Sequence, residues 1–128
     1  MAVFSTNLII YTHTDFEQTF LLEDNQSNSA KDLTGFTATC RMARSLNRAS
    51  GGVRSFNVSF TNRLLGKIRI GMTAAQTAQH PPDKYFYELM LTDPDGKVEK
   101  VIEGIAIVKQ PVTWPSPPPE NPFEPQVP

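Results

Sequence analysis

Few side chains in this sequence are of the types that catalyse reactions or bind metals. The chain has two histidines, His13 and His80, and one cysteine, Cys40. A metal site needs several histidines, cysteines or carboxylates at ligand spacing, and both histidines fall in expected loops. Cys40 lies on the apolar side of an alternating segment, so we expect it in the core and not beside a catalytic base. We therefore predict no metal site, no cofactor and no nucleophilic site.

Two groups of carboxylates could support chemistry if the fold brought them together. Glu88 and Glu103 lie on consecutive alternating segments, and paired carboxylates can perform acid–base catalysis. The segment Asp93–Gly96 (DPDG) partly matches a calcium loop, but it contains proline and lacks the bidentate glutamate at the required spacing. Proline followed by Asp-Gly is typical of a tight turn. We interpret the glutamates as surface or partner-contact residues, the DPDG segment as a hairpin turn, and the chain as non-enzymatic.

Basic residues are concentrated in the middle of the chain, because residues 33–82 contain no acidic residue. The cations of this span are Arg41, Arg44, Arg48, Arg54, Arg63, Lys67 and Arg69. Weak aromatic interleaving argues against a single-stranded nucleic-acid surface, and the net charge of −1 argues against bulk binding to nucleic acid or to an anionic membrane. Contact with a neighbouring protein and a solvated loop both stay open. Arg44, Arg48 and Arg54 are the candidate partner-binding residues.

The C-terminal stretch is the second candidate site. Eight of the eleven prolines lie from Pro111 onward. A proline-rich segment favours an extended polyproline course that loses little entropy on docking. Exposed aromatic residues on such a segment are usual anchors for a partner's groove. We predict that residues 113–128 form a docking tail that contacts another subunit. Its candidate partner-binding residues are Trp114, Pro115, Pro117, Pro118, Pro119 and Phe123.

The rest of the sequence must position these residues, and its hydrophobic pattern is that of β-strands. Apolar residues alternate with a period of two in residues 15–22, 36–43, 56–60 and 67–72, and in both arms of 84–109. Residues 7–11 form a short apolar run, which we expect to be a first edge strand. The residues expected to face the core include Phe16, Phe20, Cys40, Met42, Phe56, Val58, Phe60, Ile68, Ile70 and Met72. In the first arm of 84–109, Tyr85, Tyr87, Leu89 and Leu91 share one face, opposite Phe86, Glu88 and Met90. In the last arm, Val101, Glu103, Ile105 and Ile107 are expected to share one face, opposite Ile102, Gly104, Ala106 and Val108.

One segment departs from this period. Thr73–Gln79 is alanine-rich, begins with a threonine suited to an N-cap, and ends before Pro81 and Pro82, so it predicts one or two helical turns. About seven strands with a single short helix predict an all-β fold, an immunoglobulin-like antiparallel β-sandwich in residues 1–112 with the proline-rich tail behind it. The Cys…Trp…Cys core of true immunoglobulin domains is missing. A single cysteine fits a reducing compartment, and neither a signal peptide nor an apolar run of about 18 residues is found.

Five short segments, taken in order, resemble a small domain found in structural proteins of tailed bacteriophages. These segments are DFEQTF at 15–20, DLTGFT at 32–37, GKI at 66–68, YFYEL with LTD at 85–93, and EG at 103–104. Similar domains occur in virion structural proteins of cyanophages and at the N-terminus of the baseplate upper proteins of phages that infect Gram-positive bacteria. The likeness covers roughly residues 15–112.

The resemblance implies an immunoglobulin-like sandwich that joins parts of a virion, typically the baseplate or tail to a tail fibre or receptor-binding protein, and it supplies no catalytic residues. In baseplate upper proteins the domain precedes a longer chain, whereas here only the proline-rich tail follows, which favours an adaptor. The expected partners are other virion proteins in a symmetric, multi-copy assembly. The expected location is the tail or baseplate region of a virion, after synthesis in the host cytoplasm. The alternatives are a module that binds host-surface glycans through Tyr85, Tyr87 and Trp114, and a neck or capsid decoration protein.

Overall fold

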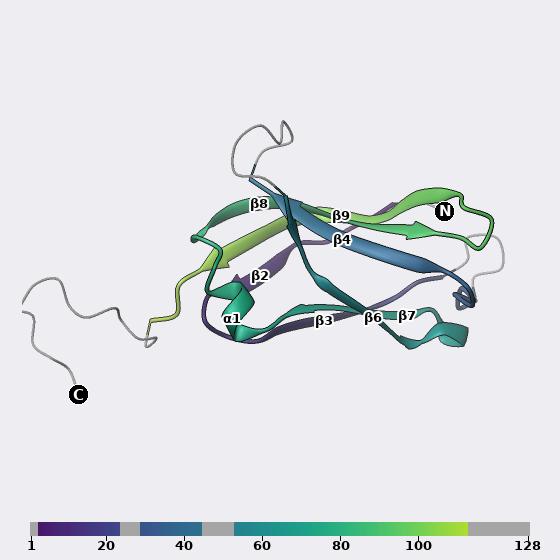
Figure 1. The fold of residues 1–128 in the computed structure, drawn as a ribbon, viewed down its shortest axis with the longest axis horizontal. Coiled ribbons are helices and arrows are strands. Elements are labelled where there is room, and N and C mark those ends of the chain that lie inside the picture. The colour runs from purple at the N-terminus through teal and green to yellow at the C-terminus, as the bar shows by residue number, and fades with distance from the viewer. Residues whose placement is uncertain (1–2, 24–28, 45–52, 113–128) are drawn as a thin grey trace, which may run out of the picture.

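The computed structural model describes residues 3–23, 29–44 and 53–112, which form two stacked β-sheets (Figure 1). The strands are β1 (Phe4–Ser5), β2 (Leu8–Tyr11), β3 (Phe16–Leu21), β4 (Thr37–Ala43), β5 (Arg54–Ser55), β6 (Asn57–Asn62), β7 (Lys67–Met72), β8 (Asp83–Thr92) and β9 (Val98–Lys109). The six-stranded sheet, here the large sheet, has the order β1-β9-β8-β4-β5, with β2 also beside β9. The three-stranded, or small, sheet has the order β3-β7-β6. The predicted all-β sandwich is confirmed.

The chain connects the two sheets in the immunoglobulin-like order. Of the seven longer strands, the second, fourth and fifth (β3, β6 and β7) form the small sheet, and the third, sixth and seventh (β4, β8 and β9) pair in the large sheet. These pairings are antiparallel. At one edge β1 and β2 pair with β9 in parallel, a detail that the sequence pattern does not reveal.

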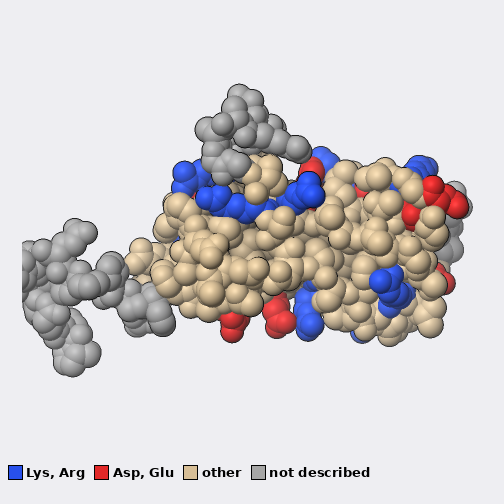
Figure 2. Space-filling model, in the orientation of Figure 1, with Lys and Arg blue, Asp and Glu red and all other residues tan. Residues whose placement is uncertain are grey.

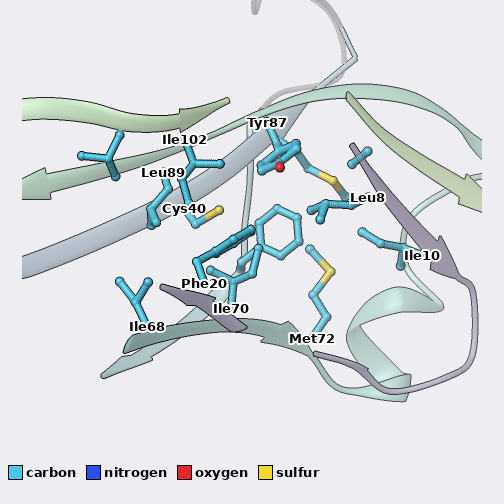
Figure 3. Packing of buried hydrophobic residues seen from close by; sticks show 14 of the residues in the cluster. Leu8, Ile10, Phe20, Cys40, Ile68, Ile70, Met72, Tyr87, Leu89 and Ile102 are labelled. Carbon is cyan, nitrogen blue, oxygen red and sulfur yellow. The ribbon is translucent and has the colours of Figure 1, made fainter. Parts of the chain in front are cut away.

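The core lies between the sheets and contains the residues that alternation places there (Figure 3). Cys40, Tyr87 and Leu89 project from the large sheet toward Ile68 and Ile70 of the small sheet. The side chains less than one tenth exposed also include Leu8, Ile10, Phe20, Leu22, Leu33, Met42, Phe56, Met72, Tyr85, Leu91, Ile102, Ala106 and Val108. Because strand side chains alternate between two faces, the period of two correctly identified the inward face of most strands.

The chain changes sheets at Phe56, between β5 and β6. The predicted loop at 44–55 includes the short strand β5, whose Arg54 lies opposite Met42 of β4. The backbone N–H of Phe56 donates to the Cys40 carbonyl at 2.8 Å, and the chain then continues into the small sheet. The Phe56 ring lies 6.1 Å from that of Phe16 and 6.3 Å from that of Tyr87. These aromatic contacts anchor Phe56, and with it the point where the chain changes sheets, in the core.

The pairing of β8 with β9 contains a bulge that the sequence pattern did not predict. Leu89 lies opposite Ile102 and Met90 opposite Lys100, so Val101 has no residue facing it. One extra residue in a strand reverses the sense of the alternation beyond it. As a result both Val101 and Ile102 are buried, at 1% and 0% exposure. The expectation that Val101 shares one face with Glu103, Ile105 and Ile107 is therefore wrong, because those three face outward.

Gly104 allows the N-terminal strand to cross β9 closely. A Cβ atom at Gly104 would lie 1.9 Å from the Thr6 carbonyl oxygen and 3.0 Å from the Tyr87 ring. The Tyr87 hydroxyl donates to that same carbonyl at 2.6 Å, and Asn7 Oδ1 accepts from the Ile105 N–H. A buried backbone carbonyl needs a hydrogen-bond donor. The Tyr87 hydroxyl is the donor for the Thr6 carbonyl, and it fits there because Gly104 has no side chain.

The predicted turns and helix are confirmed, with tighter bounds. Asp93 Oδ1 accepts from the backbone N–H groups of Asp95 and Lys97, which closes the hairpin turn between β8 and β9. The helix α1 spans Ala74–Thr77, and Thr73 caps it in a capping box with Gln76. The 3-10 helix η1 (Arg63–Leu65) follows β6.

Further hydrogen bonds close the two ends of the sandwich. At one end, Asp32 Oδ1 accepts from the N–H and hydroxyl of Thr34, and Arg63 Nη1 donates to the carbonyls of Leu33 and Phe36. At the other end, the Tyr85 hydroxyl donates to the Pro81 carbonyl at 2.7 Å. This last contact is the tyrosine corner of immunoglobulin-like sandwiches, near the start of the sixth main strand.

Candidate functional site

The outward face of the large sheet carries an apolar strip that no described residue covers. The strip consists of Ile9, Tyr11, Phe86, Ile105 and Ile107. Pairing places Ile9 opposite Ile107, and Phe86 opposite Ile105, so these side chains lie side by side across three strands. Ile9, Tyr11 and Phe86 are 50%, 45% and 37% exposed. Exposed apolar side chains that form a continuous surface are typical of an interaction site.

The strands that form the strip are apolar on both faces. In β2 and in the second half of β9, inward residues such as Ile10 and Val108 alternate with the outward Ile9 and Ile107. A strand with one face in water normally alternates apolar and polar residues, whereas a strand covered on both faces is apolar throughout. The continuous apolar runs at 8–11 and 105–108 are the sequence signal for this site, which the strand assignment did not use.

A charged ladder borders the strip. Glu103, Glu88 and Arg41 lie opposite one another across β9, β8 and β4, so the expectation that the two glutamates lie close together is confirmed. Lys100 Nζ lies 3.3 Å from a carboxylate oxygen of each glutamate. Hydrogen bonds to these two glutamates raise the pKa of Lys100. Both carboxylates are thus paired with one cation, an arrangement that suits a polar rim better than a proton-transferring pair.

A groove of about 460 Å³ runs between the strip and the ladder. Its walls include Phe86 and Ile105 on the apolar side, and Glu88, Lys100 and Arg41 on the charged side. Two other hollows are present, one of about 560 Å³ between β1 and β3 at the edge of the sandwich, and one of about 340 Å³ on the outer face of the small sheet. The first groove combines an apolar floor with a charged rim, the anatomy of a protein-binding surface.

The structure brings Arg44 and Arg54 together around one aromatic ring. Their guanidinium carbons lie 5.7 and 5.9 Å from the centre of the Tyr85 ring. Arg44 also pairs with Asp83, with Nε to Oδ2 at 3.2 Å. Figure 2 shows Lys and Arg side chains gathered above this end of the sandwich, where β8 begins. The two arginines thus stabilise the tyrosine corner, and Arg44, whose side chain is 39% exposed, still presents charge to a partner.

The other predicted partner-binding residues lie outside the described residues. They are Arg48, Trp114, Pro115, Pro117, Pro118, Pro119 and Phe123. The same holds for the proposed boundary of the tail, since residues 113–128 are not described. What the structure gives is the point from which the tail departs, at the end of β9 beside Tyr11.

Tyr85 and Tyr87 do not form a sugar-binding surface. They are 0% and 3% exposed, and their hydroxyls donate to the backbone carbonyls of Pro81 and Thr6. Aromatic residues that stack on a sugar must expose a ring face. The expectation that these tyrosines belong to a glycan site is therefore wrong, because the inward face of β8 holds them in the core.

The buried titratable groups belong to the packing. His80 is 8% exposed, and burial, together with the charge of Arg54, lowers its pKa, so it is neutral at pH 7. Burial raises the pKa of Cys40 to about 12, and the Glu88 carboxylate adds to the rise. Burial, with a smaller effect of Cys40, also raises the pKa of Tyr87. A thiol with so high a pKa is a poor nucleophile.

We expect stability to fall as the pH rises above about 9, because the unfolded chain then loses protons that the fold retains. For Cys40 alone, with a pKa of about 12 in the fold against about 8.5 in unfolded chains, the loss is about 1.4 kcal/mol per pH unit. The raised pKa values of Tyr87 and Lys100 act in the same direction. Urea unfolding between about pH 8 and pH 11 measures the slope.

The control for this slope is Cys40→Ala. It lowers stability near neutral pH by leaving a small cavity, and it should flatten the alkaline slope. Equal slopes for the parent and the variant would contradict the assignment of the effect to this thiol.

Among residues 3–23, 29–44 and 53–112, no group of three His, Cys, Asp or Glu side chains is placed to hold a metal ion. No helix within the described part of the chain is long and apolar enough to cross a membrane. In comparisons with known proteins, no family model and no curated protein matches the sequence.

Proposed function

We propose that the chain is a non-enzymatic structural protein of a tailed-bacteriophage particle, an adaptor that joins the baseplate or tail to fibre or receptor-binding proteins. The observation that carries the proposal is the apolar strip, since β2 and the second half of β9 are apolar on both faces and the described residues cover only one. Such a sheet acquires its second cover from a partner. The ordered resemblance of five segments to phage structural domains supplies the kind of particle.

In this proposal the sandwich and the tail have separate tasks. The strip and its charged rim dock on one virion component, and residues 113–128 lie along another through Trp114 and Phe123. In a symmetric particle every copy repeats both contacts, so modest individual affinities combine into a stable assembly. The partners are other virion proteins, and the protein acts in the tail or baseplate region.

The test is a chain that ends at Val112. We expect this truncated protein to be absent from purified particles, because it lacks Trp114 and Phe123, while it keeps its sandwich, whose core residues all precede Lys109. Mass spectrometry of the particles measures incorporation, and circular dichroism of the purified truncated chain checks the fold.

The control is the full-length chain carrying Leu64→Ser, at a position that is 67% exposed and remote from the strip. It should enter particles like the parent. Normal incorporation of the truncated chain would refute the role of the tail, and absence of the intact chain from particles would refute the proposed function itself.

A further inference from the structure

The exposed strip and the proline-rich tail are complementary in chemistry. The tail carries two carboxylates, Glu120 and Glu124, and no cation. The outward face around the strip carries the cations Arg41, Lys84, Lys100 and Lys109 against the carboxylates of Glu88 and Glu103. An acidic segment is therefore attracted to this face at moderate salt.

The shapes of the two are complementary as well. Polyproline segments bind in shallow grooves lined by aromatic residues. The strip presents the exposed rings of Phe86, which lines the groove of about 460 Å³, and of Tyr11, at the end of β2. Sixteen residues in a polyproline course span about 50 Å, and the four strands β2, β9, β8 and β4 are together only about 15 Å wide. The tail is therefore long enough to cross the whole face.

The direction of β9 decides which copy receives the tail. β9 ends at Lys109 at the edge of its own strip and points away from the sandwich (Figure 1). To reach its own strip, the chain would have to reverse within the few residues before Trp114. Pro111 and Pro115 fix φ in this stretch and favour an extended course. A tail that continues outward meets another molecule.

We propose that the tail of one copy docks on the apolar strip of a second copy of this chain. The inference rests on the proposed function in treating the tail as a docking element, and it names the acceptor. The contact is heterologous, because tail and strip are different surfaces, so each copy can bind one neighbour with its strip and another with its tail. Such contacts close into a ring or extend into a chain.

The experiment is sedimentation velocity on the full-length chain over a range from low micromolar to near-millimolar concentration. We expect association that grows with concentration and weakens with added salt. Two variants should each raise the dissociation constant at least about tenfold: Phe86→Ser, which alters the strip, and Trp114→Ala with Phe123→Ala, which alters the tail. Leu64→Ser removes an apolar side chain elsewhere that is even more exposed, at 67% against 37% for Phe86, and it should associate like the parent.

Mixing the two defective variants is the decisive step. The strip variant keeps an intact tail and the tail variant keeps an intact strip, so the mixture should form one-to-one dimers that neither forms alone. If both variants are defective and the mixture does not associate, the tail does not bind the strip and the inference is overturned. It is also overturned if the parent stays monomeric, or if neither variant changes the association.

Thermal unfolding of each variant checks that the sandwich is intact, and Ile9→Ser replaces Phe86→Ser if the latter fails to fold. The outcome is separable from the test of particle incorporation. A chain that enters particles but does not self-associate overturns only this inference, because the tail then binds a different virion protein. A chain that self-associates but is absent from particles overturns only the proposed function.

Discussion

Val101→Asp is expected to leave the chain largely unfolded at neutral pH. Val101 is 1% exposed, because the bulge opposite Leu89 and Met90 turns it into the core beside Ile102. An unpaired carboxylate in an apolar interior costs several kcal/mol, a large part of the about 5–15 kcal/mol that stabilises a typical domain. Circular dichroism and urea unfolding measure the effect.

The matched control is Val98→Asp, in the same strand at a position that is 56% exposed. It should change stability by no more than about 0.5 kcal/mol. If Val101→Asp cannot be purified, Val101→Thr places a hydroxyl in the same space and should cost about 1–3 kcal/mol. A Val101→Asp protein as stable as the parent would show that Val101 faces water, as simple alternation along β9 predicts.

Gly104→Ala is expected to destabilise the sandwich by about 3 kcal/mol, because it forces the N-terminal strand off β9. The new Cβ would lie 1.9 Å from the Thr6 carbonyl oxygen. Relief of this contact moves that carbonyl away from the Tyr87 hydroxyl, which donates to it at 2.6 Å. For a domain of this size we expect the melting temperature to fall by more than about 10 °C.

Gly96→Ala is the control for Gly104→Ala, because it introduces backbone strain without crowding a neighbouring atom. Gly96 has a φ of +93°, but a Cβ atom added there would have no atom within 4 Å, so alanine should cost only about 1–2 kcal/mol. Equal losses for the two variants would mean that the close passage of Thr6 over Gly104 does not exist in solution.

The period of two predicted the core residues correctly wherever burial depends only on which face of its strand a residue occupies. Cys40, Ile68, Ile70 and Leu89 are buried as their alternation requires, because the direction of a strand side chain is set by its own backbone. Val101 shows the limit of this rule. A bulge depends on how two strands pair. The sequence around residue 101 does not show which residue of β9 will lie opposite no residue of β8.

Contacts between segments that are distant in the sequence could not be predicted from it either. The N–H of Ile105 donates to Asn7 Oδ1 across 98 positions of the chain, and the parallel pairing of β2 with β9 spans a similar distance. A tight turn in the sequence, such as Asp93–Gly96, predicts that the two strands it joins pair in antiparallel. A parallel edge strand has no such local signal, since its partner lies at the other end of the domain.

The segments on which the proposed likeness to phage structural domains rests have structural roles in this fold. Asp32 forms the turn before β4, Tyr85 forms the tyrosine corner, and Gly104 admits the crossing strand. Residues of this kind are fixed by the geometry of the sandwich, so the likeness informs on the architecture more than on the partner. The candidate site lies instead on Ile9, Phe86 and their neighbours, where the strands are apolar on a face that the fold leaves exposed.

The parallel edge has a mechanical consequence. β1 pairs with the middle of β9, at Phe4 and Ile102, and β2 with its end, at Tyr11 and Lys109. The N-terminus and the start of the tail therefore leave the sandwich at opposite ends (Figure 1). A force that pulls the two ends of the chain apart would shear β1 and β2 against β9. The hydrogen bonds between these strands would then bear the load together and would not open one after another. The rate of forced unfolding depends on the barrier that such bonds set, and a link placed in series between two parts of a particle would resist tension along this edge.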